Sequence, residues 1–196
     1  MLAIPQRDVK PLAKELIRKF GSYAAVLNAS PAELMEVKGI KENAATAVKI
    51  VKESAVRCSW VELTNTDEPV ITNWDAMLDY CRTAMGHSMV EEFRIIFLNT
   101  KLKVIGEEVQ QRGTINQVAI HPREVIKAAM MKGAGAIIMV HNHPSGDITP
   151  SKADIDITNK INEGLKVVNI RLFDHLIVSK YDIFSFRDCG LIKEEF

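Results

Sequence analysis

The chain has 196 residues, of which 47% are hydrophobic and 26% are charged. This composition is typical of a globular protein and excludes a disordered chain, and the length allows one domain or two small ones. The formal net charge is zero, so the field of the whole molecule gives no indication of its partners.

The cysteines predict a reducing compartment. They are three in number, widely spaced and without a C-x-x-C motif: Cys58, Cys81 and Cys189. No apolar run approaches the roughly 20 residues of a membrane span, and the first ten residues lack the apolar core of a signal peptide. We therefore expect a cytoplasmic protein that is not inserted in a membrane. The sequence leaves the oligomeric state open.

The first 58 residues predict a small all-α domain. Helical patterns cover residues 9–21, 22–30, 31–37 and 38–58, with glycines and a proline at their ends. Residues 1–60 carry ten Lys or Arg against six Asp or Glu, a net charge of +4. The stretch "VKGIK" between two helices resembles a helix-hairpin-helix, in which backbone N–H groups of the turn bind phosphate.

That resemblance makes Gly39 and Lys41 possible DNA contacts, although Lys41 stands where the motif usually has a second glycine. The alternative is a helical bundle that serves only as a packing module. Residues 59–73 follow as a linker that mixes polar residues with a proline, and Asn73 is a good N-cap for a helix over residues 74–86.

Residues 74–196 predict a mixed α/β domain in which helices pack on a central sheet. Strand patterns alternate with two further helices, at 121–133 and 151–168. The expected strands cover residues 92–99, 102–111, 134–140, 169–179 and 182–186. The third of these is almost wholly apolar, as in a central strand that is covered on both faces.

The stretch "HNHPSGDITPSKAD" at 141–154 carries the candidate chemistry. His141 and His143 follow the central strand and are two residues apart, so their side chains project to the same side and can share a metal ion. Ser151 opens the next helix, and its first turn can bring the Asp154 carboxylate back over the histidines. Two histidines and one carboxylate leave a fourth tetrahedral position open, as in a catalytic zinc site with a bound water.

Each of these residues also has a structural explanation. A lone H-x-H is a weak signal for metal, the glycine and prolines can simply shape a turn, and Ser151-x-x-Asp154 can be a helix capping box without a chemical role. The set is more specific than its members, because the two histidines and the carboxylate converge by their spacing.

The full stretch matches the JAMM signature: H-x-H, seven residues, Ser, two residues, Asp. With "EEFRIIFLNTK", "HPREVIKAA" and "FDHLIV", residues 88–190 resemble the RadC-type branch of the JAB/MPN proteins, and residues 1–58 resemble that family's N-terminal region more loosely. The resemblance implies an MPN/JAB1-like sheet with cytidine-deaminase-like layering. It also implies a zinc ion held by His141, His143 and Asp154, with Ser151 as a hydrogen-bond donor to the developing oxyanion.

The signature also requires a glutamate on an upstream strand, where Glu91 and Glu92 are both candidates. Neighbours on a strand point to opposite faces, so only one of them can serve. Alignment with the family favours Glu91 as the general base, and we expect Glu92 to be a surface residue that is turned away. Asp174 and His175 fit the family pattern outside the zinc motif, where hydrogen bonding near a strand end is their expected role.

The sequence therefore favours a zinc-dependent metallohydrolase that cleaves a peptide or isopeptide bond in a substrate that it does not identify. The complete set of ligands argues against a non-catalytic scaffold. The alternative is a DNA-associated accessory protein that binds DNA through residues 1–58.

Overall fold

The computed structural model describes residues 8–113 and 120–192. The chain divides into two compact units, Met1–Cys58 and Ser59–Phe196. None of the helices in these described ranges combines the length and apolarity that a membrane span requires. The three cysteines are free thiols, and only Cys81 is buried.

The first unit is helical, as predicted. It contains α1 (Lys10–Phe20), α2 (Tyr23–Asn28), α3 (Pro31–Met35) and the larger part of α4 (Glu42–Thr64). Seven small or apolar side chains form its buried core: Val26, Ala29, Leu34, Val37, Ile40, Ala44 and Ala45.

Helix α4 does not end at Cys58, where the sequence placed the start of a linker over residues 59–73. It continues to Thr64 because its last turns are packed: Leu63 is buried, and the Trp60 ring lies 4.9 Å from that of Tyr80. Tertiary packing of this kind extends a helix beyond its local signals. A 3-10 helix over Val70–Asn73 then leads into α5, and the Asn73 side chain forms no capping hydrogen bond.

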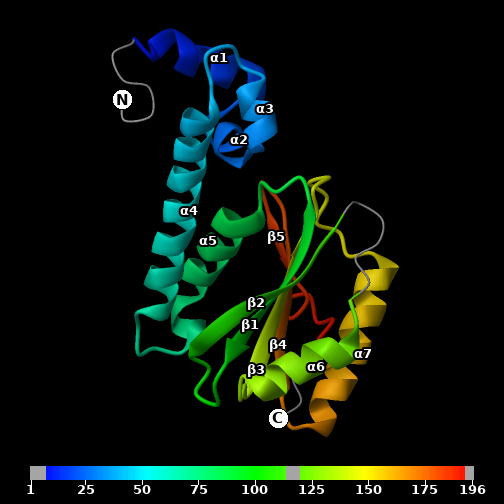
Figure 1. The fold of residues 1–196 in the computed structure, drawn as a ribbon. Coiled ribbons are helices and arrows are strands. Elements are labelled where there is room, and N and C mark those ends of the chain that lie inside the picture. Colours follow the sequence, from blue (N-terminus) through cyan, green and yellow to red (C-terminus); the bar gives the residue numbers. More distant parts are fainter. Residues whose placement is uncertain (1–7, 114–119, 193–196) are drawn as a thin grey trace. The chain divides into compact units, whose positions relative to one another are not determined.

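The second unit is built on a mixed sheet of five strands in the order β2-β1-β3-β4-β5, which confirms the predicted fold class (Figure 1). Strands β3 and β4 are parallel, and the other neighbours are antiparallel. The strands are β1 (Glu91–Leu98), β2 (Val104–Gly113), β3 (Ala136–Asn142), β4 (Arg171–Val178) and β5 (Ile183–Ser185). The central position of β3 explains its unbroken apolar sequence.

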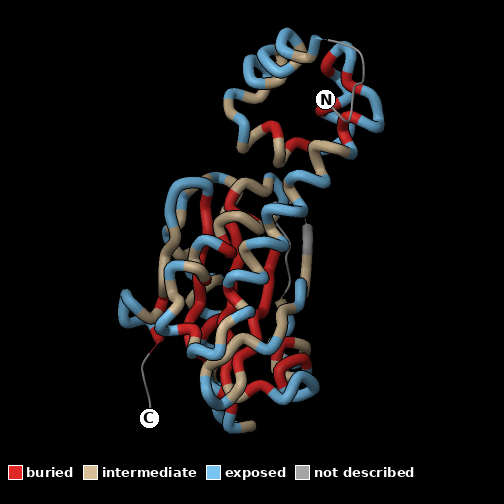
Figure 2. The backbone as a smooth tube through the Cα atoms, turned by 90° about the vertical axis from the view of Figure 1, so that its left-hand side faces the viewer, coloured by how far each residue is buried: buried red, intermediate tan, exposed pale blue. Residues whose placement is uncertain are grey.

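Helices cover both faces of this sheet (Figure 1). Helices α6 (Pro122–Met131) and α7 (Lys152–Val167) lie on one face, and α5 (Trp74–Met85) lies on the other. Strands β1, β3 and β4 are almost wholly buried, and the second unit accordingly has buried segments at its centre in Figure 2. The core on the α6 and α7 side includes Phe93, Ile95 and Phe97 of β1. Since side chains alternate along a strand, the odd positions of β1 face α6 and α7, and the even positions face α5.

Candidate metal centre

The two histidines of the H-x-H stretch approach each other closely. Strand β3 runs to Asn142, so His141 lies within the strand and only His143 lies beyond it. The prediction that both follow the strand was therefore wrong for His141, which is 3% exposed because the strand pairs on both sides up to this point. The two side chains share a face as expected, and their Nε2 atoms are 3.0 Å apart.

The carboxylate of Asp154 completes a group of three possible ligands. Its Oδ1 lies 3.3 Å from His141 Nε2, and its Oδ2 lies 3.7 Å from His143 Nε2. Burial by itself would raise the pKa of Asp154, but its contacts with His141 and Ser151 outweigh burial and hold this pKa well below its ordinary value. The carboxylate is therefore ionised at neutral pH beside two imidazoles.

These three residues could hold a metal ion, because one ligand atom from each lies within 4.8 Å of the others. Ligands bound at 2.0–2.1 Å to a tetrahedral zinc ion lie about 3.3 Å from one another. The separations of 3.0, 3.3 and 3.7 Å in the structure bracket that value. The donor set of two nitrogens and one carboxylate oxygen also suits zinc, and it leaves one tetrahedral position for a further ligand.

Ser151 forms the capping box that was the structural alternative for this pair of residues. Its Oγ accepts a hydrogen bond of 3.1 Å from the backbone N–H of Asp154, and Asp154 Oδ2 accepts one of 2.7 Å from the backbone N–H of Ser151. The capping box orients the Asp154 carboxylate. It uses Ser151 Oγ only as an acceptor, and within the described ranges the hydroxyl proton makes no hydrogen bond, so the capping and donor roles are compatible.

Two histidine contacts around the site fix the ring orientations. His143 Nδ1 lies 2.6 Å from the backbone oxygen of Asp147, in the loop before α7. His141 Nδ1 lies 2.8 Å from Nε2 of His175 on β4. His175 is completely buried, and burial followed by the proximity of His141 holds its pKa well below the ordinary value, so its ring is neutral.

Thr158 is a member of the site that the sequence analysis missed. Its buried hydroxyl lies 2.6 Å from Nδ1 of His175 and donates a hydrogen bond of 2.5 Å to the backbone oxygen of Asp154. The spacing was the available signal, since Thr158 is four residues after Asp154 and therefore lies on the same face of α7.

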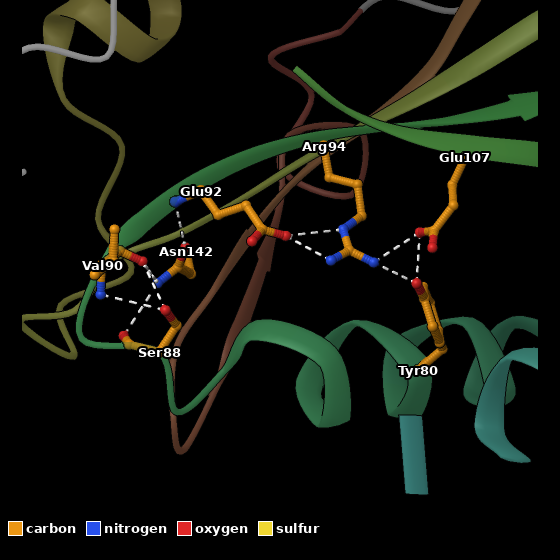
Figure 3. A network of polar contacts seen from close by, with 7 residues as sticks. All are labelled: Tyr80, Ser88, Val90, Glu92, Arg94, Glu107 and Asn142. Carbon is orange, nitrogen blue, oxygen red and sulfur yellow. Dashed lines mark hydrogen bonds and ion pairs between the residues drawn. The ribbon is translucent and has the colours of Figure 1, made fainter. Parts of the chain in front are cut away.

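The two candidate glutamates lie on opposite faces of β1. Glu91 is half-buried and shares the parity of Phe93, which pairs with His141 in the adjacent strand. Glu92 is 7% exposed and points the other way, where its Oε1 lies 2.5 Å from Arg94 Nη2 (Figure 3). The expectation that Glu92 is a surface residue was wrong, because α5 covers that face of the sheet.

Arg94 links Glu92 to a second acid on the adjacent strand (Figure 3). Its Nη1 lies 2.8 Å from Glu107 Oε2 and also contacts the hydroxyl of Tyr80 on α5. The Tyr80 hydroxyl in turn donates a hydrogen bond of 2.5 Å to Glu107, and burial raises the pKa of Tyr80 above its ordinary value. Glu92 is thus part of a buried ion network between the sheet and α5.

Asn142, between the two histidines, ties β3 to the start of β1 (Figure 3). Its Oδ1 accepts a hydrogen bond of 2.8 Å from the backbone N–H of Glu92. Its Nδ2 donates to the backbone oxygens of Ser88 and Val90, at 3.2 and 3.1 Å. These bonds hold the backbone on both sides of Glu91, so the position of Glu91 is fixed relative to the strand that carries the histidines.

Asp174 has the structural role expected for it. The carboxylate is completely buried and accepts hydrogen bonds from the backbone N–H groups of His175 and Arg187, at 2.6 and 3.0 Å, and from the hydroxyl of Ser185 at 2.6 Å. Burial raises its pKa to about 6. These bonds attach β4 to the chain that follows it. Of the two neighbours, it is His175 whose side chain contacts His141.

The possible DNA contacts lie in the first unit. Gly39 has a φ of +100°, a conformation that favours glycine, in the turn between α3 and α4. Both Gly39 and Lys41 are exposed, and Lys41 immediately precedes α4. The structure thus contains the glycine turn between two helices that the sequence predicted.

Comparison with known proteins shows similarity to one protein family. The family model of the RadC-like JAB domain matches residues 71–191. A UPF0758 protein of Rhodobacter capsulatus is 46% identical over 190 residues, which cover 97% of this chain and 88% of that protein. A UPF0758 protein of Ruegeria pomeroyi is 45% identical over 190 residues, which cover 97% of this chain and 84% of that protein.

Proposed function

The chain belongs to the family of RadC-like JAB-domain proteins, and on this basis we propose that it is a zinc-dependent hydrolase that cleaves a peptide or isopeptide bond in a protein or peptide substrate. The observation that carries the proposal is the convergence of His141, His143 and Asp154, with ligand atoms 3.0 to 3.7 Å apart. When bound by these residues, zinc supplies a Lewis acid that makes water a nucleophile near neutral pH.

The remaining chemistry is proposed for two side chains. Glu91 accepts a proton from the attacking water and returns it to the leaving amine, a role suited to a half-buried carboxylate on the histidine face of β1. The hydroxyl of Ser151 donates a hydrogen bond to the carbonyl oxygen on which negative charge develops. Its capping bond supports this assignment, because that bond fixes the hydroxyl oxygen without using its proton.

Metal content tests the ligand assignment. We expect about one zinc per chain by elemental analysis of the wild type supplied with zinc, and almost none in the double variant His141→Ala, His143→Ala. The control is His121→Ala, which removes a histidine outside the three-residue group and should leave the zinc content unchanged. Equal zinc in the wild type and the double variant, or no zinc in either, would contradict the proposal.

A substrate trap tests the hydrolase activity. Glu91→Gln keeps the proposed ligands but removes the proton acceptor, so it should retain zinc and co-purify with uncleaved substrate. Mass spectrometry then identifies proteins that are enriched over both the wild type and the ligand double variant. A candidate supports the proposal only if the purified wild type cleaves it at an amide bond and Glu91→Gln does so 10²–10⁴-fold more slowly.

DNA binding by the first unit is the second candidate function, and the positive-φ turn at Gly39 beside the exposed Lys41 favours it. Fluorescence anisotropy with duplex, branched and single-stranded DNA tests it on the full chain. Phosphate contacts predict an affinity that falls steeply with salt and weakens in Lys41→Glu. The same charge reversal at the exposed Lys132 in the second unit should have no effect. Binding that is insensitive to both salt and Lys41→Glu would exclude this function.

A further inference from the structure

A continuous chain of buried hydrogen bonds connects α7, β4 and β3 behind the metal centre. It starts at the backbone oxygen of Asp154, passes through Thr158 Oγ1 at 2.5 Å, and continues to His175 Nδ1 at 2.6 Å. From His175 Nε2 it reaches His141 Nδ1 at 2.8 Å. Thr158, His175 and His141 are 1%, 0% and 3% exposed, so this series of hydrogen bonds is shielded from solvent.

The direction of every bond in this chain follows from its first member. A backbone oxygen can only accept, so the one hydroxyl proton of Thr158 is donated to Asp154. Thr158 Oγ1 can then take part in its second contact only as an acceptor. The proton of that contact must therefore be on Nδ1 of His175.

The next step assigns the proton of His141. A neutral imidazole has one N–H, and no carboxylate within the described ranges contacts the ring of His175 to favour a second proton. With its proton on Nδ1, His175 presents the lone pair of Nε2 to His141. His141 Nδ1 must then carry a proton, which leaves Nε2, the nitrogen that faces His143 and Asp154, to present its lone pair to a metal ion.

We infer that His175, oriented by Thr158, is a positioning residue that fixes the tautomer of His141 in which Nε2 is available to a metal ion. The inference rests on the proposed metal site. In His143 a single contact places the proton on Nδ1, because this nitrogen can only donate to the backbone oxygen of Asp147. His141 lies inside the sheet, and the partner of its Nδ1 is a second histidine, His175, where His143 has a backbone oxygen. The contact with Thr158 determines which nitrogen of His175 carries the proton.

Nitrogen-15 NMR of the histidine side chains in the metal-free wild type tests the tautomer directly. We expect a protonated Nδ1 in both His141 and His175, and an unprotonated Nε2 in His175. Assignment uses the spectra of His141→Gln and His175→Gln. A wild-type spectrum in which Nδ1 of His141 or Nδ1 of His175 carries no proton would overturn the inference, and this readout needs neither bound zinc nor activity.

Zinc affinity measured by competition with a chromophoric chelator tests the consequence. Loss of the hydrogen-bond partner of a metal-ligating histidine typically weakens binding 10–100-fold. We expect this loss in Thr158→Val, which keeps the side-chain shape, and in His175→Leu. His175→Gln should keep most of the zinc affinity that is lost in His175→Leu, because an amide oxygen can accept a hydrogen bond from Nδ1–H of His141. A purely structural role of His175 predicts equal losses in the two variants.

The matched control is Thr64→Val in α4. The Thr64 hydroxyl also donates to the backbone oxygen four residues earlier, at 2.8 Å, but outside the metal centre. Its loss should leave zinc affinity unchanged. Equal affinity of the wild type and Thr158→Val would overturn the inference. A wild type that binds no zinc but has the expected NMR tautomers would instead contradict the proposed function and leave the assignment of the protons supported.

Discussion

The side chain of Asn142 accepts a hydrogen bond of 2.8 Å from the backbone N–H of Glu92, across fifty residues of sequence. The same side chain donates to the backbone oxygens of Ser88 and Val90 (Figure 3). Asn142 therefore joins the H-x-H strand to the segment that carries the proposed general base.

The first prediction concerns this connection. Asn142→Ala removes three hydrogen bonds and leaves the backbone N–H of the buried Glu92 without this acceptor, so we expect a loss of about 1–3 kcal/mol in the free energy of unfolding. Urea unfolding measures the loss, and amide hydrogen exchange over residues 88–92 should become faster. The control is Asn159→Ala at an exposed position of α7, which should change neither. Unchanged exchange in Asn142→Ala would show that the bonds do not hold β1.

The second prediction separates the two glutamates by stability. Glu92→Gln removes the charge that faces Arg94 in a buried ion network, although Glu107 still contacts that guanidinium. We expect a loss of about 1–3 kcal/mol in the free energy of unfolding for Glu92→Gln, and at most about 0.5 kcal/mol for Glu91→Gln. Urea unfolding of both metal-free variants compares them. A larger loss for Glu91→Gln would mean that Glu91, and not Glu92, stabilises the fold.

The third prediction is a pH dependence of stability that comes from Asp174. Its folded pKa of about 6 lies above the ordinary value of 3.8. Between these values the folded state binds more protons than the unfolded state, so this group makes the free energy of unfolding fall as the pH rises from about 4 to 6. A shift of this size corresponds to roughly 3 kcal/mol over the full range.

Asp174→Asn should remove this contribution, because the amide does not titrate, while its oxygen can still accept from the backbone N–H groups of His175 and Arg187. Urea unfolding of the wild type and the variant at several pH values between 4 and 7 gives the difference between their slopes. Equal slopes would mean that Asp174 does not take up a proton in the folded state.

The fourth prediction concerns the effect of metal on stability. A ligand that binds only the folded state at 100 times its Kd contributes about 2.7 kcal/mol, which corresponds to about 5–10 °C in Tm for a protein of this size. Zinc should therefore raise the Tm of the metal-free protein, and a chelator should reverse the change. Asp154→Asn keeps an oxygen for the capping bond from Ser151 but loses the anionic ligand, so zinc should raise its Tm much less. An equal rise in both proteins would exclude Asp154 as a ligand.

The arrangement of the candidate ligand residues could be predicted because it depends on short-range geometry. His141 and His143 share a face through the alternation of an extended strand, and Asp154 reaches them from the first turn of a helix that Ser151 caps. These periodicities act within fourteen residues and do not require knowledge of the rest of the fold. The same alternation predicts that Glu91 and Glu92 point to opposite faces of their strand.

The contacts that support the site could not be predicted, because they join segments that are distant in sequence. His175 meets His141 only because β4 pairs in parallel with β3, with an irregularity at Ile137/Ile138 that shifts the register. Glu92 is buried rather than exposed because α5 covers its face of the sheet, and α4 extends to Thr64 because Trp60 and Leu63 pack there. The sequence by itself thus determined which residues can bind a metal, through local periodicity. Only the tertiary structure decided which buried partners fix their protons and positions, because hydrogen bonds between strands and helices depend on the register and packing of the whole sheet.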